Sequence, residues 1–253
     1  MKNYPITALL LLLTATAQGS IALNFGAISN TAFGTAGNLT QQYATVAPGI
    51  NATMTAATPF TSLNPANNGS VLGDIRVNAA PATNVNITIS LWDASSGTGY
   101  NNLYNPGGSY SFAFGFFDID GGFDSYDVVT VYTPGTYTVT STTDLITTTG
   151  TGVSFSGSAS GEITGQGGIS TLTAAQADVA AIYTVSNTSS INFDYAVGVS
   201  GPNPNVRNLL VDGNDLMESL ATFGPVTETF IPEPSAALLA LIGAGLLGLR
   251  RRR

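Results

Sequence analysis

Short runs of alternating apolar and polar residues constrain the fold of this chain more than any other feature. The clearest run covers residues 84–92, where four apolar side chains alternate with polar ones: Val85, Ile87, Ile89 and Leu91. A period of two residues puts the two sets on opposite faces of a strand, as in an antiparallel sheet with one buried face. Residues 109–117 repeat the pattern with an aromatic core stripe of Tyr110, Phe112, Phe114 and Phe116. The chain is therefore expected to form sheets.

Similar short runs fill most of the chain between turn residues. They cover residues 21–28, 71–77, 125–133, 136–140, 153–155, 162–164, 179–185, 191–199 and 206–211. The turn Thr133-Pro134-Gly135 predicts a hairpin between 125–133 and 136–140. One helical turn is expected at 174–178, because Thr173 and Gln176 fit a capping box.

Many short strands with frequent turns favour an all-β fold, an antiparallel β-sandwich of jelly-roll type, over residues 18–212. A parallel β-helix is the alternative, suggested by the Gly, Ser and Thr-rich tract 147–168, although no fixed-period repeat supports it. Residues 213–230 are expected to be a linker.

The C-terminal segment 231–253 has three parts with different physical properties. Pro232, Glu233 and Pro234 hold the backbone extended and keep it out of a helix. An uncharged run over 235–249 follows, which suits a transmembrane helix although it is short for a bilayer. Arg250, Arg251, Arg252 and Arg253 end the chain and would stop its transfer through the membrane. The alternative is a buried C-terminal helix, but the run has no polar face for water.

Pro-Glu-Pro, an apolar helix and a terminal arginine cluster resemble the PEP-CTERM sorting signal of bacterial exported proteins. The resemblance covers 231–253 and implies recognition of Pro232, Glu233 and Pro234 by an exosortase, a membrane-embedded protease or transpeptidase. It also implies a bacterium with an exopolysaccharide envelope. A stripe of small residues on the helix, Ala236, Ala240, Ala244 and Gly248, either docks against that enzyme or reflects composition alone.

The N-terminus agrees with export. Lys2 precedes an apolar stretch at 8–13, and Ala15-Thr16-Ala17 offers a cleavage site for a signal peptide of residues 1–17. Cleavage after Ser20 or Ala22 is an alternative, as is an uncleaved anchor. We expect the protein to be anchored in the membrane of the cell envelope before processing, and then to reach the cell surface or the medium.

The composition excludes several kinds of function. The chain has 15 acidic and 7 basic residues. Lys2, the four terminal arginines and Glu233 lie at the ends, which leaves 14 acids and two bases, Arg76 and Arg207, in 18–230. Such a charge repels nucleic acid. The chain has no cysteine and no histidine, which excludes disulfides, histidine metal sites and histidine-dependent catalysis.

Four carboxylates lie within ten residues of one another, at Asp118, Asp120, Asp124 and Asp127. Asp-x-Asp-Gly-Gly can aim carboxylates and a carbonyl at one point, which suits Ca²⁺. The loop is not an EF-hand, since Val129 stands where that loop needs glutamate. The simpler interpretation is a solvated acidic turn. Calcium binding is the functional alternative, and no other cofactor is expected.

Three classes of function remain. The first is a structural protein of the cell surface or extracellular matrix without catalysis, and we favour it. The second is a carbohydrate-binding or adhesive module associated with exopolysaccharide. The third is an enzyme, which could act only through carboxylates, as glycosidases do.

Overall fold

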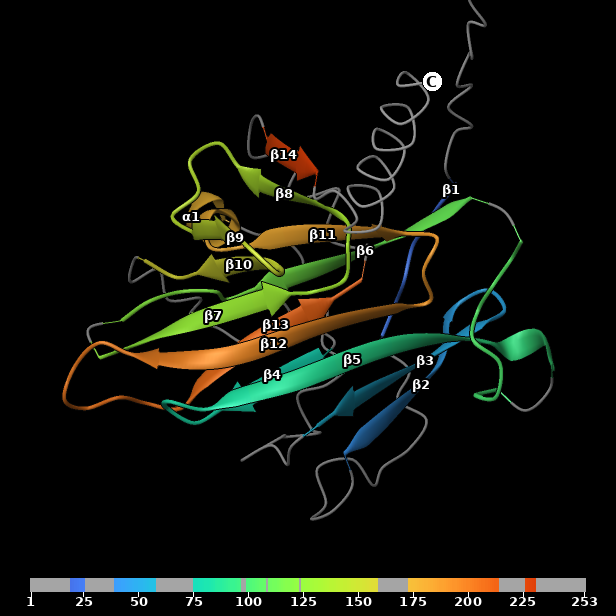
Figure 1. Cartoon of the computed structure of the whole chain (residues 1–253), viewed down its shortest axis with the longest axis horizontal. Helices are drawn as coiled ribbons and strands as arrows, with labels where there is room; N and C mark the ends of the chain where they lie inside the picture. Colours follow the sequence, from blue (N-terminus) through green and yellow to red (C-terminus); the bar gives the residue numbers. More distant parts are fainter. Residues whose placement is uncertain are drawn as a thin grey trace, which may run out of the picture.

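Two β-sheets make up the described part of the chain in the computed structural model (Figure 1). The structure describes residues 19–25, 39–57, 75–96, 99–107, 109–122, 124–158, 173–213 and 226–230. Strands dominate these residues, and every strand pair but one is antiparallel, so the all-β prediction is confirmed and the parallel β-helix is wrong.

Sheet A has the strand order β14-β8-β11-β6-β13-β4, and β1 also pairs with β6 in the one parallel contact between described strands. Its strands are β1 (Gly19–Ile21), β4 (Ile75–Ala79), β6 (Tyr110–Phe117), β8 (Thr136–Thr140), β11 (Ala181–Ser186), β13 (Arg207–Asp212) and β14 (Val226–Phe230).

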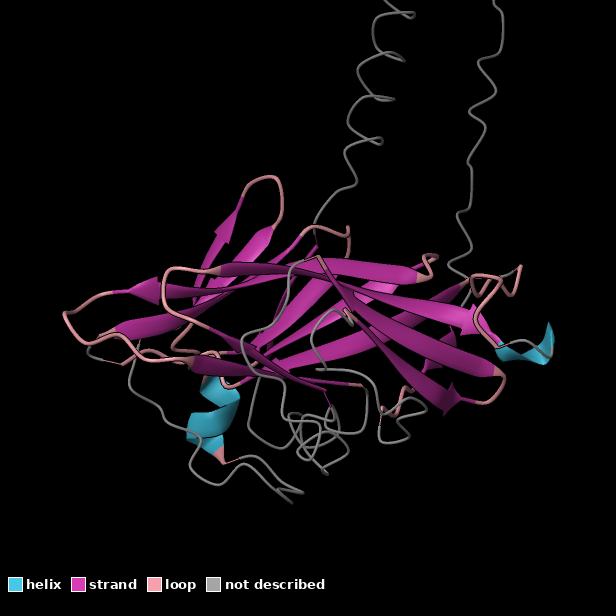
Figure 2. Ribbon diagram, turned by 90° about the horizontal axis from the view of Figure 1, so that it is seen from below, coloured by secondary structure: helices cyan, strands magenta, loops and turns pink. Residues whose placement is uncertain are grey.

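Sheet B has the strand order β2-β3-β5-β12-β7-β10-β9 and is antiparallel throughout. Its strands are β2 (Thr40–Ala47), β3 (Ile50–Ala56), β5 (Asn84–Asp93), β7 (Ser125–Val131), β9 (Ile146–Thr149), β10 (Val153–Ser156) and β12 (Ser190–Val199). A 3-10 turn, η2 (Ala94–Ser96), follows β5, and helix α1 (Ala174–Asp178) precedes β11. Figure 2 shows how few of the described residues are helical.

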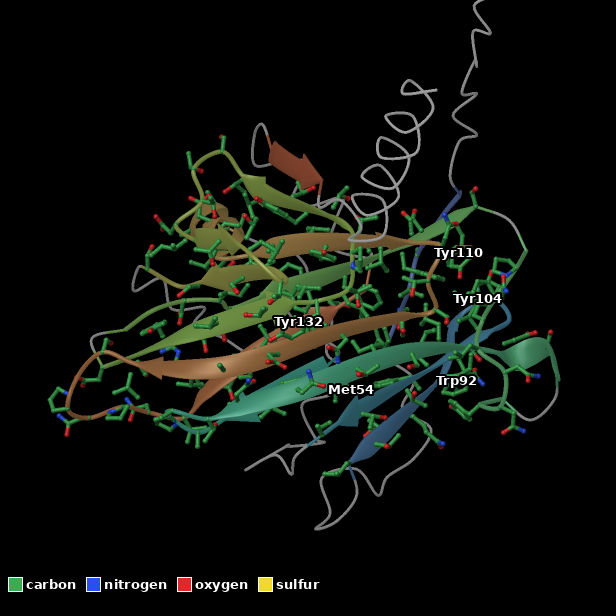
Figure 3. The ribbon with its side chains drawn as sticks, in the orientation of Figure 1. Met54, Trp92, Tyr104, Tyr110 and Tyr132 are labelled. Carbon is green, nitrogen blue, oxygen red and sulfur yellow. The ribbon has the colours of Figure 1, made fainter. Side chains whose placement is uncertain are left out.

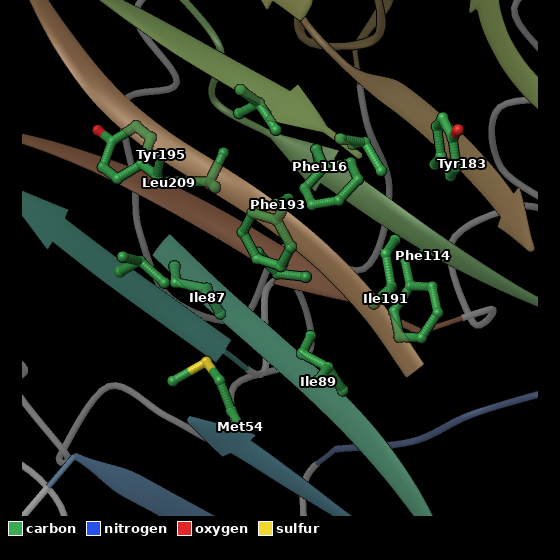
Figure 4. Close-up of a cluster of buried hydrophobic side chains, with 14 of the residues drawn as sticks. Met54, Ile87, Ile89, Phe114, Phe116, Tyr183, Ile191, Phe193, Tyr195 and Leu209 are labelled. Carbon is green, nitrogen blue, oxygen red and sulfur yellow. The ribbon is translucent and has the colours of Figure 1, made fainter. Parts of the chain in front are cut away.

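The hydrophobic core lies between the two sheets, as the aromatic contacts across them show. Phe116 of β6 meets Phe193 of β12 edge to face, with ring centroids 5.0 Å apart (Figure 4). Tyr137 of β8 meets Phe155 of β10 in the same way at 5.3 Å. The alternating residues predicted to be apolar and inward on β5 and β6 all belong to this core. Alternation therefore identified the strand faces correctly.

The predicted hairpin between 125–133 and 136–140 is wrong, because β7 belongs to sheet B and β8 to sheet A. The turn at Thr133-Pro134-Gly135 carries the chain from one sheet to the other. The Tyr183 hydroxyl donates to the Thr133 carbonyl at 2.7 Å. A Cβ on Gly135 would lie 2.3 Å from the Thr184 carbonyl oxygen, so glycine is needed where the turn passes β11.

Several other elements can be compared with the predictions from the sequence. Strands β2 and β3 lie within residues 31–69, a region whose sequence has only a weak strand pattern. Helix α1 is confirmed, and both hydrogen bonds of the capping box between Thr173 and Gln176 are present. Strand β14 pairs with β8, so the last five residues of the predicted linker belong to sheet A. The tract at 147–158 forms β9 and β10.

We expect Phe193→Ala to lower the free energy of unfolding by about 3–5 kcal/mol, because it leaves a cavity at the contact between the sheets. Ile146→Ala is the matched control, since Ile146 is 55% exposed on the edge strand β9. It should change stability by less than about 0.5 kcal/mol. Urea unfolding measures both variants, and equal losses would contradict a core placed between the sheets.

Candidate functional site

The acidic loop between β6 and β7 lies at one end of the sandwich and is largely buried. Asp118 has a positive φ of 65°, which turns the chain directly after β6. The next residue, Ile119, is fully buried in the core and fixes the loop. Asp118, Asp120 and Asp127 are buried, whereas Asp124 is partly exposed. Of the four predicted ligands, three therefore lie inside the protein, which differs from a solvated turn.

Arg207, the first residue of β13, supplies the positive charge that these carboxylates face. Its guanidinium contacts the carboxylate of Asp120 and donates from Nε to Oδ2 of Asp127 at 2.7 Å. The Tyr195 hydroxyl donates to Oδ1 of Asp127 at 2.6 Å. The backbone N–H of Asp120 donates to Oδ2 of Asp127 at 3.3 Å. Arg207 thus joins β13 of sheet A to the start of β7 in sheet B.

Burial is the largest influence on the pKa of Asp127, because its side chain is fully inaccessible to solvent. Burial raises the pKa of Asp127 to about 8, with the hydrogen bond from Tyr195 acting in the opposite direction and the charge of Asp118 adding to the rise. The nearby guanidinium of Arg207 favours the ionised carboxylate and so acts against this rise. Burial also lowers the pKa of Arg207, while Asp118 opposes that effect.

Sequence reasoning did not connect Arg207 with this loop. The available signal was composition, because Arg207 is one of only two bases between residues 18 and 230. Buried carboxylates need a cationic or hydrogen-bonding partner, so one of those two arginines was a candidate. Sequence distance hid the pairing, since Arg207 lies 80 residues from Asp127.

The calcium prediction for Asp118, Asp120, Asp124 and Asp127 remains a prediction. Over the described ranges, no group of three or more acidic side chains is arranged to hold a metal ion. The backbone carbonyl of Asp124 accepts from the amides of Ser200 and Gly201 at 3.0 and 3.2 Å. That oxygen is therefore already engaged by the loop after β12.

The outward side of sheet B carries a second polar arrangement, centred on Asp194 of β12. Asn84 and Asn86 of β5 donate to the two oxygens of its carboxylate at 2.9 and 2.6 Å. The hydroxyl of Tyr132, just after β7, donates to Oδ2 at 2.7 Å. Partial burial acts to raise the pKa of Asp194, but these hydrogen bonds outweigh it and hold the pKa below its ordinary value. Asp194 is thus a fixed acceptor.

The other acids that could form a glycosidase pair are Asp93, Glu162, Asp194, Asp212 and Glu218, and those that the structure describes lie on separate strands. Asp93, at the end of β5, accepts from the backbone and hydroxyl of Ser95, which lowers its pKa. Asp212, the last residue of β13, is buried and accepts from the backbone of Gly213 at 2.6 Å. Glu162 and Glu218 lie outside the described residues.

The predicted sorting residues Pro232, Glu233, Pro234 and Arg250 to Arg253 lie outside the described residues, as do the predicted signal peptide and the helix at 235–249. No helix within the described ranges is long and apolar enough to cross a membrane. Strand β14 ends at Phe230, two residues before Pro232.

The C-terminal tail of the chain matches a known family model. The family model of the PEP-CTERM protein-sorting motif matches residues 230–253. The tail is therefore a PEP-CTERM sorting signal, which implies export and sorting to the cell envelope or surface. No curated protein matches the chain.

Replacing Arg207 with glutamine should destabilise the protein in a pH-dependent way. With the guanidinium in place, burial already raises the folded-state pKa of Asp127 to about 8, above the unfolded value of about 3.9. Removing the neighbouring cation should raise that pKa further. A carboxyl with a raised folded-state pKa contributes stability below the unfolded pKa and loses it as pH rises through the folded pKa. The variant should therefore lose further stability relative to the wild type as pH rises above about 8, and leaving the buried carboxyl without its partner should cost about 3–5 kcal/mol.

Urea unfolding at several pH values measures this loss. The control is the double variant Arg207→Gln/Asp127→Asn, in which no carboxyl at position 127 titrates. It should abolish most of the added pH dependence, and a double variant as pH-sensitive as the single one would contradict the role assigned to Asp127.

Calcium binding can be tested by thermal unfolding. A cation that binds only the folded state raises Tm, so the prediction requires a higher Tm in millimolar Ca²⁺. Asp120→Asn should abolish the rise, whereas Asp144→Asn, at an exposed acid outside the loop, should keep it. An unchanged wild-type Tm would leave Arg207 as the counter-ion of an acidic turn.

Proposed function

We propose that this chain, which ends in a PEP-CTERM sorting signal, is an exported structural protein of the cell surface or extracellular matrix. The match of residues 230–253 carries the proposal. An exosortase recognises Pro232, Glu233 and Pro234, cuts near them, and releases or re-anchors the body. The two ends of the chain then serve transport, and the folded body is what reaches the surface.

The chemistry of the two ends supports this route. Residues 1–17 direct export, and the apolar segment 235–249 follows the body into the membrane. Moving Arg250 to Arg253 through lipid costs about 2.5–3.5 kcal/mol for each arginine on the lenient insertion scale. Transfer therefore stops there, and Pro232 to Pro234 stay at the outer surface, where prolines keep the backbone extended and open to an enzyme.

The body of the proposed surface protein acts without catalysis, and it needs no cofactor other than the calcium predicted for the acidic loop. Its candidate acids are engaged in structural contacts, as the Arg207 contacts and the three hydrogen bonds to Asp194 illustrate. A chain without histidine or cysteine also lacks the usual general base and the thiol nucleophile.

We also infer a jelly-roll connectivity for the body, and the strand order supports it. From β4 to β8 each consecutive strand changes sheet, and so does each from β10 to β13. Four neighbouring strands in each sheet have the orders β4-β13-β6-β11 in sheet A and β5-β12-β7-β10 in sheet B. Two four-stranded sheets with this interleaved order have the arrangement of a jelly roll. The remaining strands extend the edges of the sheets or, in the case of β1, pair beside β6.

A carbohydrate-binding or adhesive module is the second candidate function. One observation favours it, namely the ordered amide, carboxylate and hydroxyl groups on the outward side of sheet B. Such groups match the hydroxyls of a polysaccharide, and display at the surface would bring the two together.

Changing Glu233 to alanine in the native host tests the sorting proposal. We expect an uncut, longer form to accumulate in the membrane, with less protein at the surface or in the medium, because the enzyme loses the side chain between the two prolines. Immunoblots of membrane, surface and medium fractions measure both effects.

Glu228→Ala provides the matched control, because Glu228 lies just before the matched segment 230–253. This variant should be processed like the wild type. If Glu233→Ala is cut and distributed like the wild type, the tail is an anchor and not a processed signal.

A further inference from the structure

The outward side of sheet B is built as a fixed polar surface, which we call the polar face. It consists of the outward side chains of β5, β12 and β7 and of the adjacent Tyr132. Alternation places polar residues there on both central strands: Asn84, Asn86, Thr88 and Ser90 on β5, and Ser190, Asn192 and Asp194 on β12. Figure 3 shows the side chains of this sheet, with Tyr132 labelled near β12.

Hydrogen bonds between neighbouring strands hold these side chains in place. Asn192 donates from Nδ2 to Oδ1 of Asn86 at 3.0 Å and to the hydroxyl oxygen of Thr88 at 2.9 Å. Asp194 accepts from Asn84, Asn86 and Tyr132. Between β7 and β10, the hydroxyl oxygens of Thr130 and Ser154 lie 2.7 Å apart, within hydrogen-bond distance. A ligand that binds here meets side chains that have already lost their rotamer freedom, which lowers the entropic cost of binding.

Two tyrosine rings add apolar surface to the polar face. Tyr126 of β7 lies over Gly198 of β12, because a Cβ on Gly198 would come 2.2 Å from the ring. Tyr132 is 38% exposed and is fixed through its hydroxyl. An aromatic ring beside ordered hydrogen-bonding groups matches a sugar ring, which has apolar C–H faces and a rim of hydroxyls.

The charge of the body and the residue types on the polar face disfavour several classes of ligand. The body carries 14 acids and two bases, so it repels nucleic acid and anionic polymers. A second copy of the chain would bring one Asp194 against another. Protein interfaces are centred on apolar, aromatic and arginine residues, whereas the middle of this face holds asparagine, threonine, serine and aspartate.

We propose that the polar face binds an extended, neutral polysaccharide chain. The face is one side of a sheet, and its polar rows repeat from strand to strand at about 4.8 Å. Such a surface offers many weak contacts along a polymer and few to a single sugar. This inference deepens the adhesive function proposed above and depends on that function only for the ligand being met at the surface.

The test uses the full chain in mild detergent and native affinity electrophoresis in gels that contain hydroxyethylcellulose, a neutral linear glucan. We expect the wild type to be retarded, and alginate, an anionic polymer, to retard it much less. Tyr132→Ala should weaken retardation about tenfold, the size of effect typical of a central contact residue. Tyr132→Phe should keep most of the binding, because it retains the ring.

Two further variants test the location of the binding site. Ala196→Arg should block the polar face, and Asn102→Ala is a control away from it. Ala196 lies on the outward side of β12 opposite Asn84, so arginine there blocks the face without removing a side-chain hydrogen bond. Its binding should fall as in Tyr132→Ala. Asn102 is exposed in the loop after β5 and off the face, and its variant should bind like the wild type.

Thermal unfolding confirms that each variant is folded. The proposal is overturned if neither the neutral nor the anionic polymer retards the wild type, or if Ala196→Arg and Tyr132→Ala bind as well as it does. Preference for alginate, or retardation by self-association in gels without polymer, overturns it as well. Sorting plays no part in this assay, so failure here leaves the proposed export and processing untouched, and the Glu233→Ala result leaves this inference untouched.

Discussion

The burial of aromatic and aliphatic side chains between two sheets is the constraint on which the rest of this structure depends. No disulfide can staple the chain, since it has no cysteine, so burial between the sheets has to provide most of the stability. Phe116 and Phe193 meet from opposite sheets at the centre of that core. Because the inward side of each strand is committed to this contact, the outward side of sheet B can carry polar groups.

The ion pairs of Arg207 add less to net stability than the apolar core does, and they contribute instead to the specificity of the fold. A buried ion pair contributes little net stability compared with apolar residues of the same volume, because both charges lose their hydration. Breaking it is costly, however, since an unpaired buried carboxylate remains. The contacts of Arg207 with Asp120 and Asp127 therefore fix which end of β13 meets the start of β7. We interpret the cluster as a device that specifies the register between the sheets.

The sequence predicted individual strands well and their partners poorly, for a physical reason. Alternation on β5 and β6 depends only on which face is buried, and the capping box before α1 depends on residues three positions apart. Such local rules can be read from the chain. The partner of β7 depends on contacts 68 to 80 residues away, such as those of Tyr195 and Arg207 with Asp127. The supposed hairpin after β7 failed because a turn motif specifies a reversal of the chain but not the sheet that it enters.

The strand order determines how much of the chain must be present before the body can fold. Since consecutive strands from β4 to β8 and from β10 to β13 lie in opposite sheets, neither sheet can be completed before most of the chain is present. Non-local pairing of this kind folds slowly, because loop closure precedes the contacts that reward it. The last described strand, β14, ends just before the sorting motif and pairs with β8. The body therefore completes sheet A with residues adjacent to the signal. Under the proposed function, a tail held in the membrane would keep the chain at the cell while its long-range strand pairs form.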